Sequence, residues 1–200
     1  MMERYKGRWI LIIVLTTLLI AMYAYQSVDG KMNIEREYPD MNESISLHID
    51  NNGVIHIEGD GKLFAKDFKR MIKSNKISYQ DVKDIIIGDG ITEIGYLTFN
   101  QIKYLKTLKI GSGVIRVVPS ALKNCTSLEW LYLPSGVKEI GTDFLFGCDK
   151  CHVVTDAQSE SMKTMHISGR IIAAVDSYKA LQTAVGEDTV LPDALAEWWR

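Results

Sequence analysis

Hydrophobic residues between Ile85 and Phe99 fit neither regular secondary-structure period. The segment, IIIGDGITEIGYLTF, opens like a buried strand and then turns at the glycines that flank Asp89. Beyond the turn the apolar residues recur at uneven intervals, whereas strands repeat every two residues and helices about every 3.6. This pattern predicts a coil in which a bending backbone keeps its apolar side chains directed toward one axis.

The same pattern occurs three times with a period of 23 residues. The aligned triplets are Gly90, Gly113 and Gly136; Ile85, Leu108 and Leu131; Ile87, Ile110 and Leu133; Ile91, Val114 and Val137; Ile94, Val117 and Ile140; Phe99, Leu122 and Leu145; Ile102, Cys125 and Cys148; and Leu105, Leu128 and Cys151. A period in this range is typical of leucine-rich repeats, in which each repeat forms one coil of a solenoid. We therefore predict a short, β-rich leucine-rich-repeat solenoid over residues 81–155, with equivalent side chains stacked in ladders.

Segments on both sides of the repeats predict end structures for the array. Asn51-Asn52-Gly53 separates two alternating segments and favours a β-hairpin, and Phe64–Lys73 has apolar residues at helical spacing. We expect residues 45–80 to form an amino-terminal hairpin cap. The apolar stripe from Ile171 to Val185, which ends at Gly186, predicts a helical cap within residues 156–200.

The amino terminus has the pattern of a membrane anchor. Residues 1–8 form a short basic flank, and the uncharged run 9–25 is bordered by Trp9, Tyr23 and Tyr25. This is the short limit of a spanning helix, with aromatic residues where the membrane interfaces would lie. We expect a single-pass signal anchor over 9–25, a polar stalk over 26–44 and an extracytoplasmic remainder. A cleaved signal peptide, giving a secreted protein, is the alternative.

Composition narrows the class of function. The formal net charge is -2 and no basic cluster resembles a nucleic-acid footprint. Phosphate-binding, zinc-protease and serine-hydrolase motifs are all missing from the sequence, so we assign no catalytic residues. We therefore expect a binding protein and not an enzyme.

The three cysteines offer two other interpretations. Cys148-Asp149-Lys150-Cys151-His152 matches the c-type haem attachment pattern, for which Met162 or Met165 would be an axial ligand. Zinc ligands could be drawn from Cys148, Cys151, His152 and His166. Both cysteines, however, occupy inward positions of the repeat, as Cys125 does. We therefore favour a buried apolar role and assign neither metal ligands nor a cofactor, although Cys125 and Cys148 are also placed for a disulfide on adjacent coils.

Strand alternation predicts one binding face. If Leu131 and Leu133 point inward, Trp130 and Tyr132 point outward. Equivalent outward positions on the neighbouring coils extend this face. The six predicted binding-face residues are Trp130, Tyr132, Thr107, Lys109, Asp84 and Ile86. We expect the two aromatic rings to be exposed anchors for a ligand, unless the carboxy-terminal helix or the segment 64–73 folds over them.

The segments DGITEIGYLTF, NCTSLEWLYLPSGV and LPSGVKEIGTDFLFGC resemble the BspA-like leucine-rich repeats of bacterial surface proteins. The resemblance covers about residues 47–154. It departs at Thr98-Phe99 and Phe144-Leu145, where Ala-Phe is usual, and at Val118-Pro119, which replaces Ile-Gly. It implies recognition of a protein or glycan at the cell surface, without catalysis. A haem protein, or an accessory subunit that docks a larger membrane complex, are the alternative functions.

Overall fold

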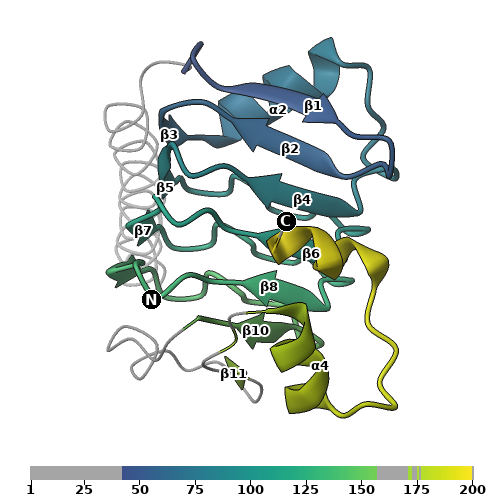
Figure 1. Ribbon diagram of the computed structural model, residues 1–200. Helices are drawn as coiled ribbons and strands as arrows, with labels where there is room; N and C mark the ends of the chain where they lie inside the picture. Colours follow the sequence, from purple (N-terminus) through teal and green to yellow (C-terminus); the bar gives the residue numbers. More distant parts are fainter. Residues whose placement is uncertain (1–41, 157–170, 173–174, 176, 200) are drawn as a thin grey trace, which may run out of the picture. The chain divides into compact units, whose positions relative to one another are not determined.

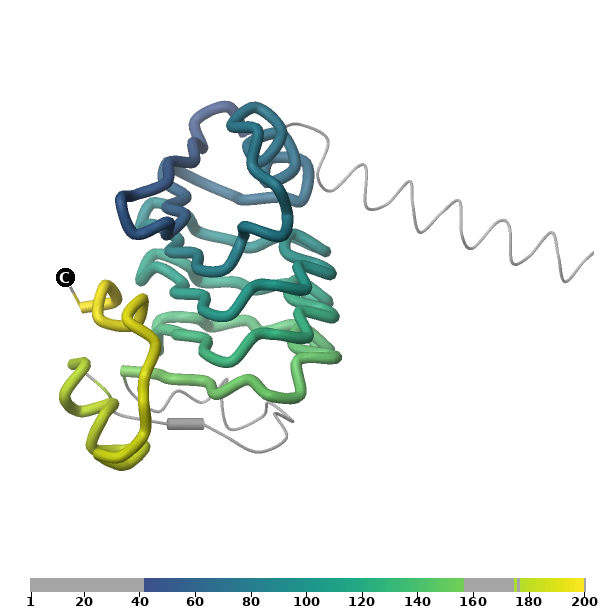
Figure 2. Tube along the Cα trace, turned by 90° about the vertical axis from the view of Figure 1, so that its right-hand side faces the viewer, coloured from purple at the N-terminus to yellow at the C-terminus, as the bar shows by residue number. Residues whose placement is uncertain are grey.

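Two β-sheets line two sides of a stack of coils (Figures 1 and 2). The computed structural model describes residues 42–156, 171–172, 175 and 177–199, all within one compact unit, Met41–Arg200. Sheet A contains, in spatial order, β1 (Ser46–Ile49), β2 (Ile55–Glu58), β4 (Asp84–Ile87), β6 (Thr107–Lys109), β8 (Trp130–Tyr132), β10 (His152–Val154) and β11 (Ile171–Ile172). Sheet B contains β3 (Gly61–Leu63), β5 (Ile91–Ile94), β7 (Arg116–Val117) and β9 (Glu139–Ile140).

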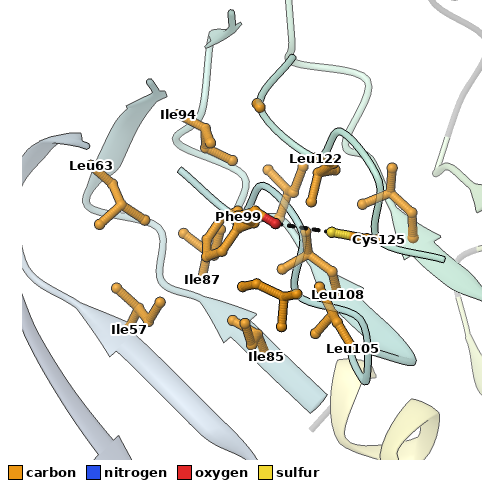
Figure 3. Packing of buried hydrophobic residues seen from close by; sticks show 14 of the residues in the cluster. Ile57, Leu63, Ile85, Ile87, Ile94, Phe99, Leu105, Leu108, Leu122 and Cys125 are labelled. Carbon is orange, nitrogen blue, oxygen red and sulfur yellow. Dashed lines mark hydrogen bonds between the residues drawn. The ribbon is translucent and has the colours of Figure 1, made fainter. Parts of the chain in front are cut away.

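The strands pair in the register that the repeat predicts. Ile85 lies beside Leu108, and Leu108 lies beside Leu131, in parallel pairs of sheet A. All three side chains are fully buried, and Figure 3 shows Ile85 and Leu108 packed with Phe99 in the core. The predicted solenoid and this inward ladder are therefore confirmed, while the ladder members Ile140 and Leu145 of the last coil are only partly buried. Each coil buries its apolar edge only against its neighbours, so the stack is stabilised as a unit.

The amino-terminal hairpin forms as predicted and joins the stack. β1 and β2 are antiparallel, while β2 runs parallel to β4, with Ile55 beside Ile85. Helix α2 (Ala65–Ser74) follows and buries Phe68, Met71 and Ile72. The side chain of Asp67 is also buried, because one carboxylate oxygen accepts a hydrogen bond from the Phe64 N–H (2.9 Å) and the other from the Asn42 N–H (2.7 Å). These charge-assisted bonds fix the start of the helix.

A row of alternating charges crosses sheet B. Lys62 Nζ lies 3.2 Å from Glu93 Oε2, which is 3.6 Å from Arg116 Nη1. Arg116 in turn contacts Glu139 through Nε at 3.1 Å. Glu93 is the buried member, with only 6% of its side chain exposed, so its two cationic neighbours matter more than those of a typical surface pair.

The carboxy-terminal region differs from the prediction. The expected helix over 171–185 is wrong in its first part, because β11 (Ile171–Ile172) instead extends sheet A parallel to β10. Helix α4 (Tyr178–Val185) begins only after Ser177, whose side chain accepts a hydrogen bond from the Ala180 N–H. A 3-10 helix, η1 (Asp193–Trp199), follows, and the segment 177–199 lies against the outward face of sheet A (Figure 1).

The predicted membrane span, 9–25, lies outside the described residues. Within the part of the chain that the structure describes, no helix is long and apolar enough to cross a membrane. The predicted stalk, 26–44, is described only from Asn42. Here the Asn42 side-chain amide donates a hydrogen bond to the Asp60 carbonyl (2.7 Å), so the last stalk residues are joined to the hairpin.

Candidate recognition surface

The structure brings all six predicted binding-face residues onto the outward face of sheet A. Thr107 pairs with Asp84 on one side and Trp130 on the other, and Lys109 lies between Ile86 and Tyr132. The Thr107 hydroxyl donates to Asp84 Oδ1 at 2.7 Å. The predicted grouping of these side chains is therefore confirmed.

The predicted exposure of the Trp130 and Tyr132 rings is wrong, and the alternative of a cover from the carboxy-terminal region holds instead. Trp130 is only 6% exposed, Thr107 is fully buried and Tyr132 is partly buried. The reason is the segment 177–199, which forms a second apolar core against this face. The buried members of this core are Trp130, Val154, Val175, Leu181, Leu191, Leu195 and Trp198.

Aromatic and polar contacts join the covering segment to the sheet. The rings of Trp198 and Trp199 meet Tyr132 edge-on, with centroids 5.8 and 6.1 Å away. The Lys109 ammonium donates to the Trp198 carbonyl oxygen. Burial lowers the pKa of Lys109, and the nearby Asp89 carboxylate opposes that change. In this conformation the face binds the protein's own carboxy-terminal segment, and whether it also binds another ligand stays a prediction.

Because Tyr132 is partly buried beneath the covering segment, the free energy of unfolding should depend on pH in the range where tyrosine ionises. Burial, with smaller contributions from Asp156 and Asp89, raises its pKa to about 12. Because an unfolded tyrosine ionises near pH 10, unfolding is favoured as pH rises from about 10 toward the folded-state value. We expect the wild-type protein to lose more unfolding free energy between about pH 9 and pH 11 than Tyr132→Phe does. Chemical denaturation at both pH values measures this difference, and equal losses would contradict the buried position of the phenol.

A hollow lies at the edge of the covered face. It is lined by Trp130, by the adjacent coil and by Val190 and Pro192 of the covering segment. The rings of Trp130 and His152 stack there with centroids 4.6 Å apart. Acidic side chains (Glu129 and Asp149) and a basic one (Lys150) line the hollow, so its charge does not identify one class of ligand.

The amino-terminal part of sheet A remains open. His48 and His56 are opposite each other on β1 and β2, with parallel rings whose centroids are 4.8 Å apart. Together with Glu58 they offer three potential ligand atoms within 4.8 Å of one another. We assigned no metal ligands from sequence. The hairpin register places the two histidines opposite each other. Glu58 lies on the same face as His56 because side chains alternate along β2.

The cysteines lie in the core, as the repeat predicts. Cys125, Cys148 and Cys151 are all buried free thiols. The Cys125 thiol donates to the Phe99 carbonyl at 2.9 Å, and the Cys148 thiol donates to Leu122 at 3.1 Å (Figure 3 shows the first). The Cys125 and Cys148 thiols thus each join their coil to the preceding one, whereas the Cys151 thiol contacts the carbonyl of the adjacent His152.

Cysteine chemistry fits this buried role. The contact with Cys148, together with burial, holds the pKa of Cys125 above its usual range, and burial does the same for Cys151. Thioether attachment of haem requires accessible thiols at a haem edge, so the described residues do not support that alternative. Met162, Met165 and His166, considered above as ligands, lie outside the described residues.

Comparison with known proteins agrees with the geometry. The BspA type leucine rich repeat region, in six copies, matches residues 70–169, which is half of the chain. The chain belongs to the BspA-type leucine-rich repeat family. The BspA-type match starts within α2, includes β10 and ends before β11. Leucine-rich repeat domains of this kind are typically non-catalytic and bind proteins.

Among solved structures, the BspA-type chain is similar to a leucine-rich repeat protein from Eubacterium ventriosum ATCC 27560, solved at 2.50 Å resolution. The two are 12% identical, with a TM-score of 0.36 over 60% of this chain and 43% of the other. The chain thus spans less than half the length of that protein. No curated protein matches the chain.

Proposed function

We propose that the protein is a membrane-anchored, extracytoplasmic module that recognises another protein and performs no catalysis. The repeat family supports protein binding, and solenoids commonly bind through a continuous sheet surface. The uncharged run at 9–25 behind a basic flank supports the anchor. In this proposal the hairpin and α2 cap the amino-terminal end of the stack.

One part of the outward face of sheet A is covered and another part is exposed, and this difference determines where we place the recognition site. The segment 177–199 covers the outward side of β6, β8 and β10, whereas Ser46, His48 and Glu58 on the hairpin are exposed. The hairpin is hydrogen-bonded to the stack through β4, so its side chains are held on a rigid support. Little conformational entropy is lost when such a surface binds, and we place the recognition site there.

Site-specific photo-crosslinking tests this assignment. A benzophenone amino acid replaces Ser46 on the open face, and a matched variant carries it at Lys138, an exposed position beside sheet B. After irradiation of cells that express the full chain, we expect a discrete protein adduct from position 46 and none from position 138. Equal adducts, or none at position 46, would contradict the proposed surface. An adduct that glycosidase removes would indicate a glycan ligand instead.

Membrane topology requires a separate measurement. A membrane-impermeant amine reagent added to intact cells should label exposed lysines of the solenoid, such as Lys66 and Lys138, as strongly as in lysed cells. A cytoplasmic protein with exposed lysines, labelled only after lysis, is the control. Labelling of the solenoid that also requires lysis would refute the extracytoplasmic placement.

A further inference from the structure

The open face of the hairpin holds two histidines and two carboxylates close together. His48 on β1 and His56 on β2 are cross-strand partners, and Glu58 follows His56 on the same face. Ligand atoms of these three residues all lie within 4.8 Å of one another. Imidazole nitrogen and carboxylate oxygen are the ligands that zinc and related divalent transition metals accept.

Side-chain movement alone can bring these ligand atoms close enough to bind one ion. With zinc–ligand bonds of about 2.0–2.2 Å, tetrahedral ligand atoms lie about 3.3–3.6 Å apart. The present 4.8 Å exceeds that by little more than one ångström. His48 and Glu58 are exposed, so these two side chains can rotate toward His56, which is partly buried and contacts Asp50. The backbones stay fixed, because the hairpin pairs with β4.

Asp50 has the position of a residue that orients a metal-binding histidine. Its Oδ2 lies 3.3 Å from His56 Nε2. Its Oδ1 accepts hydrogen bonds from the Asn52 and Val54 N–H groups, both at 2.9 Å, so the turn holds the carboxylate in place. A histidine that binds a metal commonly donates its other ring N–H to such a carboxylate. With Nε2 directed to Asp50, Nδ1 of His56 is left to coordinate the ion.

The charges around the cluster favour a cation. Asp50 and Glu58 each place a carboxyl group beside the histidines, and Asp84 on β4 adds a third acidic side chain to the same face. None of the outward positions on β1, β2 and β4 is lysine or arginine. An ion at the histidine pair would therefore meet attraction without a competing ammonium or guanidinium group.

We propose that His48, His56 and Glu58 bind one zinc-class divalent ion, with Asp50 as the residue that positions His56. Three protein ligands leave a fourth coordination position, which faces solvent and takes water. The site shares His48 and Glu58 with the recognition surface proposed above, but ion binding requires no partner and is tested without one.

Metal titration of the purified full-length chain tests the site. With ZnCl₂ alone as the probe, calorimetry should give one ion per chain. His48→Ala and His56→Ala should each weaken binding at least tenfold, and Asp50→Asn should weaken it about 10- to 100-fold, as loss of an orienting partner does. A double variant, Cys148→Ser with Cys151→Ser, is the matched control and should bind zinc as the wild type does.

Cobalt(II) substitution gives a second, independent readout. Nitrogen and oxygen ligands should produce a weak visible spectrum without the intense thiolate charge-transfer absorption that cysteine ligands give. Without metal, the histidine variants should melt near the wild-type temperature, because His48 is exposed and His56 is partly exposed. Wild-type affinity in both histidine variants, loss of binding in the cysteine variant, a thiolate spectrum, or no binding by the wild type would each overturn the proposal.

Discussion

Leu131→Ala should lower the free energy of unfolding by about 2–5 kcal/mol, the range measured for large-to-small changes in a packed core. Leu131 is fully buried and continues the ladder of Ile85 and Leu108. The cavity would open between adjacent coils, and neither coil could fill it without losing its pairing to the next. Urea denaturation followed by circular dichroism measures the change.

The control for this prediction is Ile115→Ala, in the same array but at a side chain that is 51% exposed. Its effect should stay near or below about 0.5 kcal/mol, because little packing is lost at the surface. A loss for Leu131→Ala no larger than that for Ile115→Ala would show that the repeat register is wrong.

Gly113→Ala is the second change with a large expected effect. A Cβ atom at Gly113 would lie 1.8 Å from the backbone oxygen of Asp89 in the preceding coil, whereas at the equivalent Gly136 the nearest atom would be 3.4 Å away. Both alanines enter the same repeat position, but only the first forces two backbones apart. We expect Gly113→Ala to destabilise by about 1–3 kcal/mol or more, as overpacked sites do.

Gly136→Ala serves as the matched control and should change stability by well under about 1 kcal/mol. Comparing the two melting curves separates close approach between coils from the general effect of removing a glycine. Equal destabilisation of the two variants would show that the contact with Asp89 does not decide the choice of glycine.

The repeat made the coil predictable, because the same inward positions are specified three times. Leu108, Leu131 and Cys125 occupy the places that the ladder assigns, and the hairpin follows from its Asn-Gly turn. The segment that covers the outward face of sheet A, by contrast, has no repeated copy in the sequence. Trp198 lies 68 residues from Trp130, and no period relates the two.

The apolar residues Leu191, Leu195 and Trp198 were the available indication of this cover. Placed near the carboxy terminus, they predict a buried segment, for which the face with Trp130 and Tyr132 was the alternative to a ligand surface. The same limit applies to the helix expected over 171–185. Its apolar stripe was compatible with a helix throughout, yet the free edge of β10 binds Ile171–Ile172 as a strand. An unpaired strand edge offers backbone hydrogen bonds that helical periodicity cannot reveal.

The hairpin face shows a similar division. The cross-strand pairing of His48 and His56 could be read from the turn, but the approach of Asp50 to His56 depends on hydrogen bonds within the loop. Side-chain geometry of this kind has no counterpart in the hydrophobic pattern. Sequence therefore locates the histidine pair and, by strand alternation, Glu58, whereas only the structure places Asp50 beside His56.

The alternating charges on sheet B determine which changes in the number of coils keep opposite charges side by side. Lys62, Glu93, Arg116 and Glu139 alternate in sign from coil to coil. Deleting the single coil that carries Glu93 would place Lys62 beside Arg116, whereas deleting two adjacent coils would restore a cation beside an anion. Like charges on neighbouring strands are unfavourable. Repeat number in such arrays should therefore evolve in steps of two, and internal deletions of 23 and 46 residues (one and two periods of this sequence), compared by melting temperature per remaining coil, would measure that preference.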